Sequence, residues 1–509
     1  MRTLAILLIL CACASAFGAT YPASNASYVA VSNAVALASS GDTVTVPAGT
    51  AIWTNNLTIA KNLNLIGSNT VIVKYDTTVS HQIITWNPTG STNQLSGFIF
   101  AGLNGPHQYD GAIYLNGSCN AFRVDHCMFS NLWNVPIWIS GAIFGVIDHC
   151  TIQDVQFCNS LEIKNGNYGG GSYAYGDYSW ASTPNYGTTN GWLYVEDCLF
   201  HHFQSAAIDD FDNGSRLVFR HNTIIDSYFQ DHGTESSQRE RGGRAFEVYA
   251  NTFTITNNGI PAQAVPINLR SGSGVICSNT FVNYTRLWAL QTFRAESPYS
   301  PWGSANGQNP WDTNNPVMIT NGTHTGATAG YLTDTNHTFT VNQFYPGYEL
   351  QNYTAGGTNS LCYSIIYSND AHNIYYLASV AAFSYMQFTN GNAYRIYQTY
   401  RNLDQIGNGS GDLIAGDTPL NQVTGLASWP QQSSEGVYQW QNTFDGVTNY
   451  AYGTNYQGYN IVLNRDYFDT NKPAYTPLIY PHPLVTGYTP PSPPSGDGST
   501  NIPPSILTL

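Results

Sequence analysis

The side chains best suited to acid–base chemistry lie between residues 164 and 270 of this 509-residue chain. In a β-elimination, Lys, Arg or His neutralises the carboxylate of a uronic acid and removes the proton on the adjacent carbon. In a hydrolysis, two carboxyl groups serve as acid and base. The candidates for these catalytic roles are Lys164, Asp209, Asp210, Asp231, His232, Arg244 and Arg270.

Two of these carboxylates, Asp209 and Asp231, are also predicted metal ligands. Ca²⁺ prefers hard oxygen ligands such as carboxylates. A bound cation would help to neutralise the carboxylate of an acidic sugar. Calcium is therefore the cofactor that the sequence indicates for a lyase.

Aromatic and further charged residues nearby are candidate contacts for a sugar chain. The Gly-rich stretch 165–190 is crowded with tyrosines, and aromatic ring faces suit the C–H faces of pyranose rings. The alternative is a plain solvent-exposed loop, because Tyr is frequent throughout the chain. The predicted substrate contacts are Trp138, Glu162, Tyr175, Tyr178, Trp180 and Arg241.

A repeat of about 24 residues would bring these residues together. Six segments share the pattern apolar, polar, polar, Cys or Asn, any, apolar. A second motif precedes several of them and alternates apolar and polar residues before an Asn-Gly or Ser-Gly pair, as in 113–117 and 137–141. That motif predicts a short strand and a turn. The Cys/Asn positions are Cys127, Cys150, Cys198, Asn222, Asn251 and Asn279.

Short strands at this spacing, without a helical pattern between them, predict a solenoid whose strands pair in parallel with their equivalents above and below. The Cys/Asn positions should then stack in the interior, although a disulfide between Cys127 and Cys150 is an alternative. The second residues of the strand motif should form one outward column: Tyr114, Trp138, Glu162, Asp209 and Asn268.

The chain resembles the right-handed parallel β-helix proteins of the pectate-lyase-like superfamily. The resemblance covers Gly41 to about Trp311 and includes the entry segments 41–49, 57–59 and 63–67. It implies an all-β, single-stranded right-handed β-helix. Asp209-Asp210 and His232-Gly233 are similar to elements of the polygalacturonases, but neither their complete set nor a full pectate-lyase signature is present.

Residues 1–16 read as a secretory signal peptide, with a basic start, a short apolar run and a small-residue cleavage site. We expect the β-helix over 20–316, opened by an amphipathic capping helix within 28–39, and an inserted or appended β module over 317–400. The repeat motif returns at 437–444, so that 401–489 should rejoin the β-helix. The Pro-, Gly- and Ser-rich tail 490–509 should be disordered.

A second group of charged residues precedes the Cys/Asn positions: Asp125-His126, Asp148-His149, Glu196-Asp197 and Arg220-His221. Histidines and carboxylates at this spacing can bind a transition metal. The alternative is a solvated polar strip on the outer wall.

The net charge of −14 argues against nucleic acid as a partner. No stretch after the signal peptide predicts a membrane span, and the expected location is secreted or at the cell surface. Basic residues concentrated between Arg216 and Arg294 favour an acidic, uronate-containing extracellular polysaccharide. The leading hypothesis is a polysaccharide lyase. The alternatives are an inverting glycoside hydrolase and a non-catalytic glycan-binding adhesin or surface protein.

Overall fold

The computed structural model describes most of the region between residues 18 and 486. The described ranges are 18–74, 82–90, 93–102, 111–133, 135–155, 160–165, 184–189, 191–201, 207–209, 214–231, 242–256, 265–284, 288–290, 318–327, 330–344, 349–354, 362–376, 387–397, 406, 435–445, 447–448, 453–454, 461, 463–464 and 466–486.

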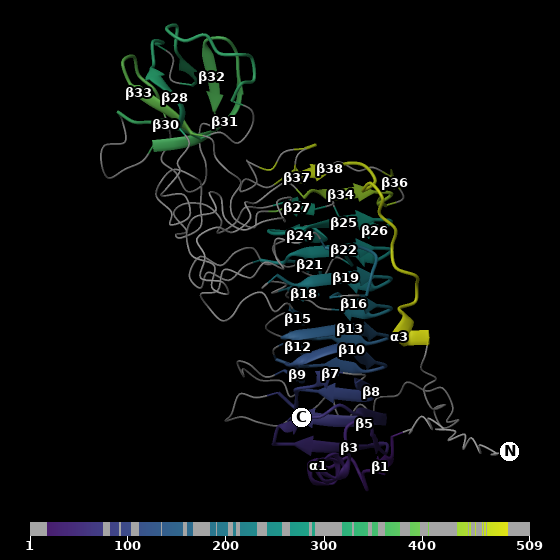
Figure 1. Ribbon diagram of the computed structural model, residues 1–509. Coiled ribbons are helices and arrows are strands. Elements are labelled where there is room, and N and C mark those ends of the chain that lie inside the picture. Colours follow the sequence, from purple (N-terminus) through teal and green to yellow (C-terminus); the bar gives the residue numbers. More distant parts are fainter. Residues whose placement is uncertain are drawn as a thin grey trace, which may run out of the picture.

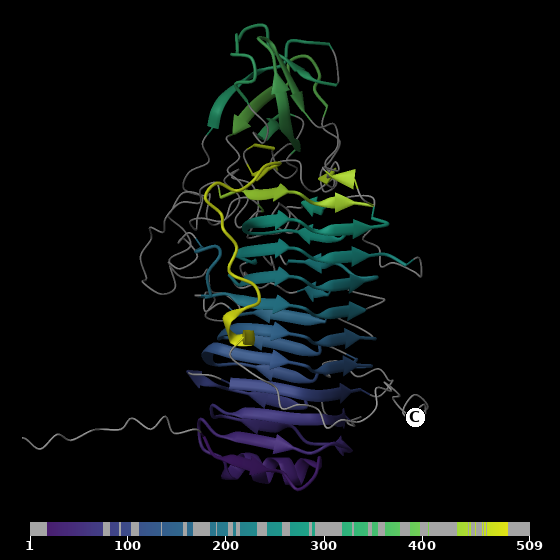
Figure 2. The same ribbon diagram turned by 90° about the vertical axis from the view of Figure 1, so that its right-hand side faces the viewer.

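The chain forms a right-handed parallel β-helix, as the repeat predicts (Figures 1 and 2). One wall is a 10-stranded parallel sheet, sheet B. Its strands are β4 (Leu57–Ile59), β6 (Ile84–Trp86), β9 (Ile113–Leu115), β12 (Ile137–Ser140), β15 (Leu161–Lys164), β18 (Ile208–Asp209), β21 (Phe229–Gln230), β24 (Ile267–Leu269), β27 (Trp288–Leu290) and β37 (Gly453–Thr454).

The remaining β-helix strands belong to a 22-stranded sheet, sheet A, which bends into two walls. Its strands are β1 (Thr20–Pro22), β2 (Thr43–Val46), β3 (Gly49–Trp53), β5 (Asn64–Lys74), β7 (Thr89–Gly90), β8 (Asn93–Ala101), β10 (Ser118–Asp125), β11 (Met128–Ser130), β13 (Ala142–Asp148), β14 (Thr151–Gln153), β16 (Leu193–Glu196), β17 (Leu199–His201), β19 (Arg216–Arg220), β20 (Thr223–Ile225), β22 (Ala245–Tyr249), β23 (Thr252–Thr254), β25 (Ser273–Cys277), β26 (Thr280–Val282), β34 (Val437–Trp440), β35 (Thr443–Phe444), β36 (Val447–Thr448) and β38 (Tyr467–Phe468).

Each turn of the coil runs from sheet B into the first wall of sheet A, which includes β10, β13, β16, β19, β22 and β25. The predicted glycine turns lie between these two walls, and Gly141 and Gly272 have positive φ angles of 72° and 73°. A second bend separates the first wall from the second wall, which includes β11, β14, β17, β20, β23 and β26. Non-glycine residues in left-handed conformation, such as His126 and His149, form that bend.

The Cys/Asn positions stack inside the coil directly after this bend, in agreement with the prediction. Cys127, Cys150 and Cys198 are buried free thiols, so the disulfide alternative is wrong. From Asn222 onward the column becomes an amide ladder. Asn222 donates through Nδ2 to Asn251 Oδ1 at 3.0 Å, and Asn251 donates to Asn279 Oδ1 at 3.0 Å. Each side-chain amide thus supplies a hydrogen-bond partner to its neighbour in an interior that excludes water.

Apolar side chains fill the rest of the interior, including stacked rings such as Phe100 on Phe129 and Phe253 on Phe281. The N-terminal end is closed by helix α1 (Tyr28–Leu37), which confirms the predicted capping helix. The Ser27 hydroxyl caps this helix by accepting from Ala30 N, and α1 buries Val31, Ala34 and Val35 against the first strands.

Beyond the last rungs of sheet B, residues between 318 and 397 form a separate six-stranded antiparallel sheet, sheet C, with its own core. This confirms the predicted additional β module. Its strands are β28 (Met318–Thr323), β29 (Leu332–Thr333), β30 (Glu349–Asn352), β31 (Cys362–Asn369), β32 (Asn373–Tyr376) and β33 (Ala393–Tyr397).

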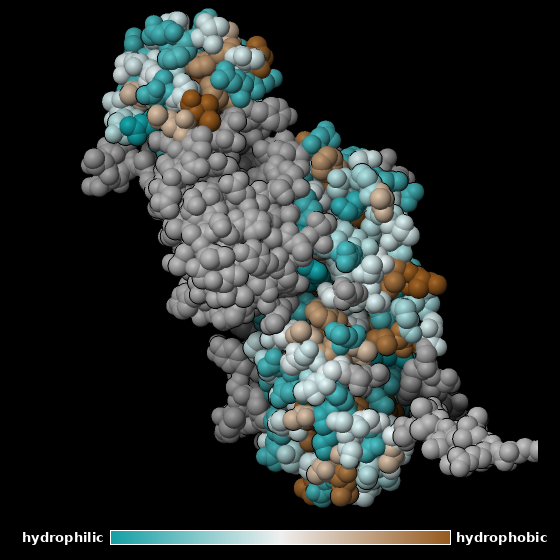
Figure 3. All heavy atoms as spheres, in the orientation of Figure 1, coloured by the Kyte–Doolittle hydropathy of each residue, from teal (hydrophilic) through white to brown (hydrophobic). Residues whose placement is uncertain are grey.

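After the module, the chain returns to the coil. β34 pairs in parallel with β25, and Asn442 continues the amide ladder by accepting from Asn279. Residues 471–486, which we call the C-terminal strap, then run back along the outer face of the first wall to the short helix α3 (Pro483–Thr486) beside β13 (Figures 1 and 2). Figure 3 shows that the described surface is largely hydrophilic to neutral, with hydrophobic residues in small patches.

Candidate functional site

The outer face of sheet B carries the predicted column. Strand pairing places Trp138 beside Tyr114 on one side and beside Glu162 on the other, and Glu162 beside Asp209. Further along, Gln230 pairs with Asn268. We call these residues the sheet B column. Its register follows from the strand period of two, which keeps every second side chain on the same face.

The first part of the column is aromatic. The rings of Tyr114 and Trp138 lie 4.9 Å apart at an interplanar angle of 49°. Both side chains are partly exposed. The indole N–H of Trp138 has no hydrogen-bond acceptor among the described residues. That N–H is buried, so it is the partly exposed ring faces that suit the C–H groups of a sugar.

The central part of the column is charged. Lys164 Nζ lies 3.2 Å from Glu162 Oε1, and the Lys164 side chain is 19% exposed. Both residues come from β15, two positions apart, and therefore share a face. The backbone of Asp209 lies at the next level of the column, while its side chain lies outside the described residues.

The far part of the column combines amides with a buried carboxylate. Asn268 Nδ2 donates to Gln230 Oε1 at 2.7 Å. Asp231 is fully buried, and its carboxylate accepts the backbone N–H groups of Arg270 and Ser271 at 2.5 and 3.1 Å. Arg270 Nε donates in turn to the Asp231 carbonyl oxygen at 3.1 Å. The structure therefore brings Asp231 and Arg270 together, and the hydrogen bonds of the Asp231 carboxylate hold the turn after β24.

Arg244 takes part in a different arrangement from the one that the sequence predicts. It directly precedes β22, is fully buried, and pairs through Nη2 with Glu435 Oε2 at 2.7 Å. Its Nη1 donates to Ser273 Oγ, which also contacts the Tyr186 hydroxyl at 3.0 Å. Glu435 is not among the predicted site residues, because it lies almost two hundred residues further along the chain, outside the repeat motif.

The other predicted site residues, Asp210, His232, Tyr175, Tyr178, Trp180 and Arg241, lie outside the described residues. Of the two predicted calcium ligands, Asp231 accepts two backbone N–H groups with its carboxylate, and the side chain of Asp209 lies outside the described residues. Within the described ranges there is no group of three or more His, Cys, Asp or Glu side chains that could hold a metal ion. Calcium at Asp209 and Asp231 stays a prediction.

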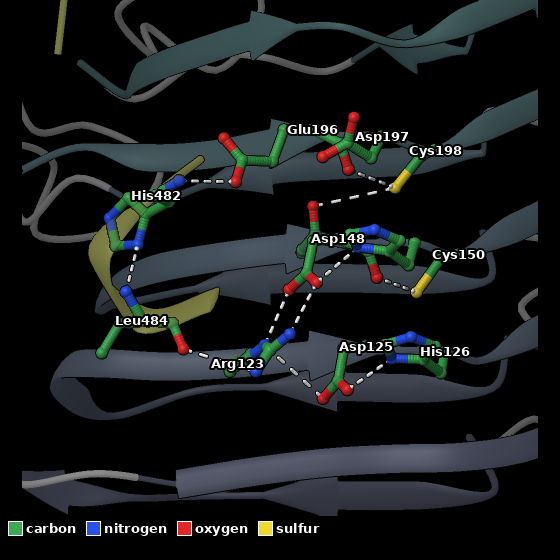
Figure 4. Close-up of polar contacts among 12 residues, drawn as sticks. Arg123, Asp125, His126, Asp148, Cys150, Glu196, Asp197, Cys198, His482 and Leu484 are labelled. Carbon is green, nitrogen blue, oxygen red and sulfur yellow. Dashed lines mark hydrogen bonds and ion pairs between the residues drawn. The ribbon is translucent and has the colours of Figure 1, made fainter. Parts of the chain in front are cut away.

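The charged pairs that precede the Cys/Asn positions on sheet A form no metal site among the described residues, and they are not a fully solvated strip either. Their first members, Asp125, Asp148, Glu196 and Arg220, are buried. Arg123 makes two 2.8 Å bonds to Asp148, and the ring nitrogens Nδ1 of His126 and His149 lie 2.8 Å from Asp125 and Asp148 (Figure 4). The rings of His126 and His149 stack at 5.0 Å.

The C-terminal strap covers this buried charge network. His482 N donates to Glu196 Oε1 at 2.8 Å, and Arg123 Nη1 donates to the Leu484 carbonyl at 3.3 Å (Figure 4). Tyr475 and Tyr480 donate to Glu247 and Asp197, each at 2.6 Å. The signal that sequence analysis overlooked is the apolar outer face of the first wall, where Val146, Tyr194 and Val218 need a cover.

His482 predicts a pH dependence of stability. Burial, and then the charges of Arg220 and Arg123, lower the pKa of His482 to about 4. The unfolded chain takes up this proton near pH 6.5. Stability should therefore be complete above pH 6.5 and should fall as the pH drops from about 6.5 to 4, because only the unfolded state binds the proton.

Urea unfolding of wild type and His482→Phe at several pH values checks this expectation. Phe keeps a ring where the His482 ring packs 4.7 Å from Tyr194, but it cannot take up a proton. The wild type should therefore lose its stability advantage over His482→Phe as the pH falls. His126→Asn is the control. The hydrogen bond to Asp125 raises the pKa of His126. The contribution of His126 to folding stability is therefore lost only as the pH rises above about 6.5, not as it falls. Parallel pH profiles for wild type and His482→Phe would contradict the prediction.

No helix in the described part of the chain has the length and apolar character needed to span a bilayer. No family model matches the sequence, and no curated protein matches it. Among solved structures, the chain is similar to the crystal structure of the Dettilon tailspike protein (gp208) at 11% identity, over 73% of this chain and 90% of that chain. The TM-score is 0.26, which is too low to bear on function.

Proposed function

We propose that this protein is exported through its N-terminal signal peptide, binds an acidic extracellular polysaccharide along the sheet B column, and cleaves it by β-elimination. The observation that carries the proposal is the pairing of Trp138 with Glu162 on neighbouring strands. This pairing puts an aromatic surface for a sugar ring next to the Glu162–Lys164 ion pair, on one continuous face.

The cations of the column support an acidic substrate. Lys164 is partly exposed, and Arg270 lies three levels further along, where its position is held by Asp231. A cation that neutralises a uronate carboxylate acidifies the C–H bond beside it. Lys164, one level from Trp138, is thus well placed to act on a sugar that stacks on Trp138.

The proposed reaction conserves atoms and charge. A base, for which we assign Lys164 after it has released the ammonium proton of its ion pair with Glu162 to water, removes the proton from the carbon that bears the carboxylate. The electron pair forms a carbon–carbon double bond, and the bond from the next carbon to the glycosidic oxygen breaks. That oxygen takes up a proton from water as the leaving group. Arg270, three levels away, holds the carboxylate of another uronate of the same chain.

Hydrolysis fits the described residues less well. It needs two carboxyl groups on either side of the bond, one to donate a proton and one to activate water or attack. Of the described carboxylates of the predicted site, Glu162 is paired with Lys164, and Asp231 is fully buried and accepts two backbone N–H groups. Neither arrangement leaves a proton donor at the surface.

The test is product analysis on polygalacturonate, alginate and glycosaminoglycans, with and without EDTA. We expect unsaturated uronate, detected by its ultraviolet absorbance. Lys164→Ala should lower kcat/KM by about 100-fold or more, as for loss of a general base. Trp138→Ala should mainly raise KM. Thr223→Ala, an exposed change on the second wall of sheet A, should have no effect. The EDTA arm tests the calcium prediction.

Each result separates the candidate functions. Reducing ends without unsaturation would replace the lyase by a hydrolase. Retention on an acidic polysaccharide without any product would leave a binding protein or adhesin. If no acidic polysaccharide is bound or cleaved, or if Lys164→Ala behaves like Thr223→Ala, the proposal is wrong.

A further inference from the structure

Three tyrosines lie in a row across one face of sheet C. The strands β31, β32 and β29 are neighbours in this sheet. Tyr375 of β32 is central. The ring of Tyr331, the residue before β29, lies 5.6 Å from it, and the ring of Tyr367 of β31 lies 6.4 Å from it. We call these three residues the tyrosine row.

Strand geometry turns the tyrosine row away from the core of the module. Ile374 and Tyr376 flank Tyr375 and are buried, so that alternation directs Tyr375 to the opposite face. In β31 the register with β32 shifts between Ile366 and Ser368, which makes Tyr367 the extra residue of a β-bulge. A bulge re-aims a side chain, and here it brings Tyr367 next to Tyr375.

The central ring is held in place before any ligand arrives. The Tyr375 hydroxyl donates to Asp370 Oδ2 at 2.8 Å. Asp370 also accepts from the backbone N–H groups of His372 and Asn373, at 2.8 and 2.7 Å. Hydrogen bonds from Asn373 and His372 hold the pKa of Asp370 well below its usual range. The row therefore combines a fixed ring with an ionised carboxylate, while Tyr367 stays 52% exposed.

We propose that the tyrosine row is a second carbohydrate-binding site, which takes a chain of neutral pyranose units. The face of an aromatic ring is electron-rich, and the C–H groups of a pyranose face it favourably. Three rings in line offer such faces to successive sugars. The negative charge of Asp370 disfavours a uronate at this place, since like charges repel.

This site differs from the sheet B column in both ligand and task. It would hold the protein on a neutral polysaccharide, or on a neutral stretch of a mixed one, and it performs no chemistry. A fixed ring loses little freedom on binding, which favours affinity. The inference does not depend on whether the sheet B column cleaves its substrate.

The experiment is affinity electrophoresis of the full chain through gels that contain xylan, hydroxyethyl cellulose, galactomannan or polygalacturonate. We expect retardation of the wild type by at least one of the neutral polymers. The double variant Tyr367→Ala/Tyr375→Ala should lose about tenfold or more in affinity for that polymer. The single variant Tyr367→Ala changes only an exposed residue of the bulge and should show a smaller loss in the same direction.

Tyr353→Ala is the matched control. Tyr353 is 54% exposed in the same module, but the Arg395 guanidinium lies over its ring at 3.7 Å, so that one ring face is already covered. It should bind like the wild type. The proposal is overturned if no neutral polymer retards the wild type, if both Tyr367 variants bind unchanged, or if Tyr353→Ala loses as much affinity. Product release from polygalacturonate by the double variant should be unchanged, which separates this site from the sheet B column.

Discussion

Replacing Arg220 by Ala is expected to lower the free energy of unfolding by about 3–5 kcal/mol, because it leaves the buried Glu196 carboxylate without its cation. Both residues are fully buried, and Arg220 Nε lies 2.6 Å from Glu196 Oε2. Arg220 also donates to the Tyr249 hydroxyl at 2.9 Å and to the carbonyl of Leu478 in the C-terminal strap at 2.9 Å. Its loss should therefore weaken the hold of the strap as well.

Urea unfolding followed by tryptophan fluorescence measures this effect. The double variant Arg220→Met/Glu196→Gln removes both charges and should be clearly more stable than Arg220→Ala, since the penalty arises from the lone buried carboxylate. Burial raises the pKa of Glu196, which agrees with a carboxylate that relies on its partner to stay ionised. If the free energy of unfolding of Arg220→Ala lies within about 1 kcal/mol of the wild-type value, as for loss of an exposed ion pair, the buried charge network contributes little to stability.

Replacing Asn251 by Ala should lower the free energy of unfolding by about 3 kcal/mol, the second large effect, because it interrupts the amide ladder in its middle. Asn251 Oδ1 accepts from Asn222 N at 2.9 Å, and Asn251 Nδ2 donates to the Phe219 carbonyl at 2.8 Å. Removal of the amide leaves these buried groups unsatisfied, and each such group costs about 1–3 kcal/mol. Thermal unfolding should show the loss as a lower midpoint.

Asn64→Ala is the control for the ladder. Asn64 lies in β5 of the same sheet, is partly exposed, and its amide makes a 3.4 Å bond to Thr43 Oγ1. Its loss should cost well under 1 kcal/mol. Asn251→Cys should fall between the two, because Cys198 shows that a thiol fits the column and can bond to a backbone carbonyl. Equal midpoints for Asn251→Ala and Asn64→Ala would mean that the ladder is not a main source of stability.

The amino-acid sequence by itself determined the coil and its vertical register. The repeat around Cys127, Cys150 and Asn222 indicates which residues occupy equivalent positions in successive turns. Stacking of equivalent strands then places Trp138 beside Tyr114 and Glu162. Strand pairing obeys a local period of two and a constant spacing between neighbours. For this reason the order of residues along one face can be derived from the chain alone.

Only the tertiary structure decided which charges meet. Arg244 pairs with Glu435, and Arg220 is enclosed by the C-terminal strap, although both partners lie far outside the repeat unit. Asp231 also turned out to hold backbone N–H groups of the next turn. Such contacts depend on where a long insertion returns and on how the chain folds back over a wall. Neither leaves a periodic trace in the sequence, because the packing of a single crossing segment is set by shape and charge in three dimensions.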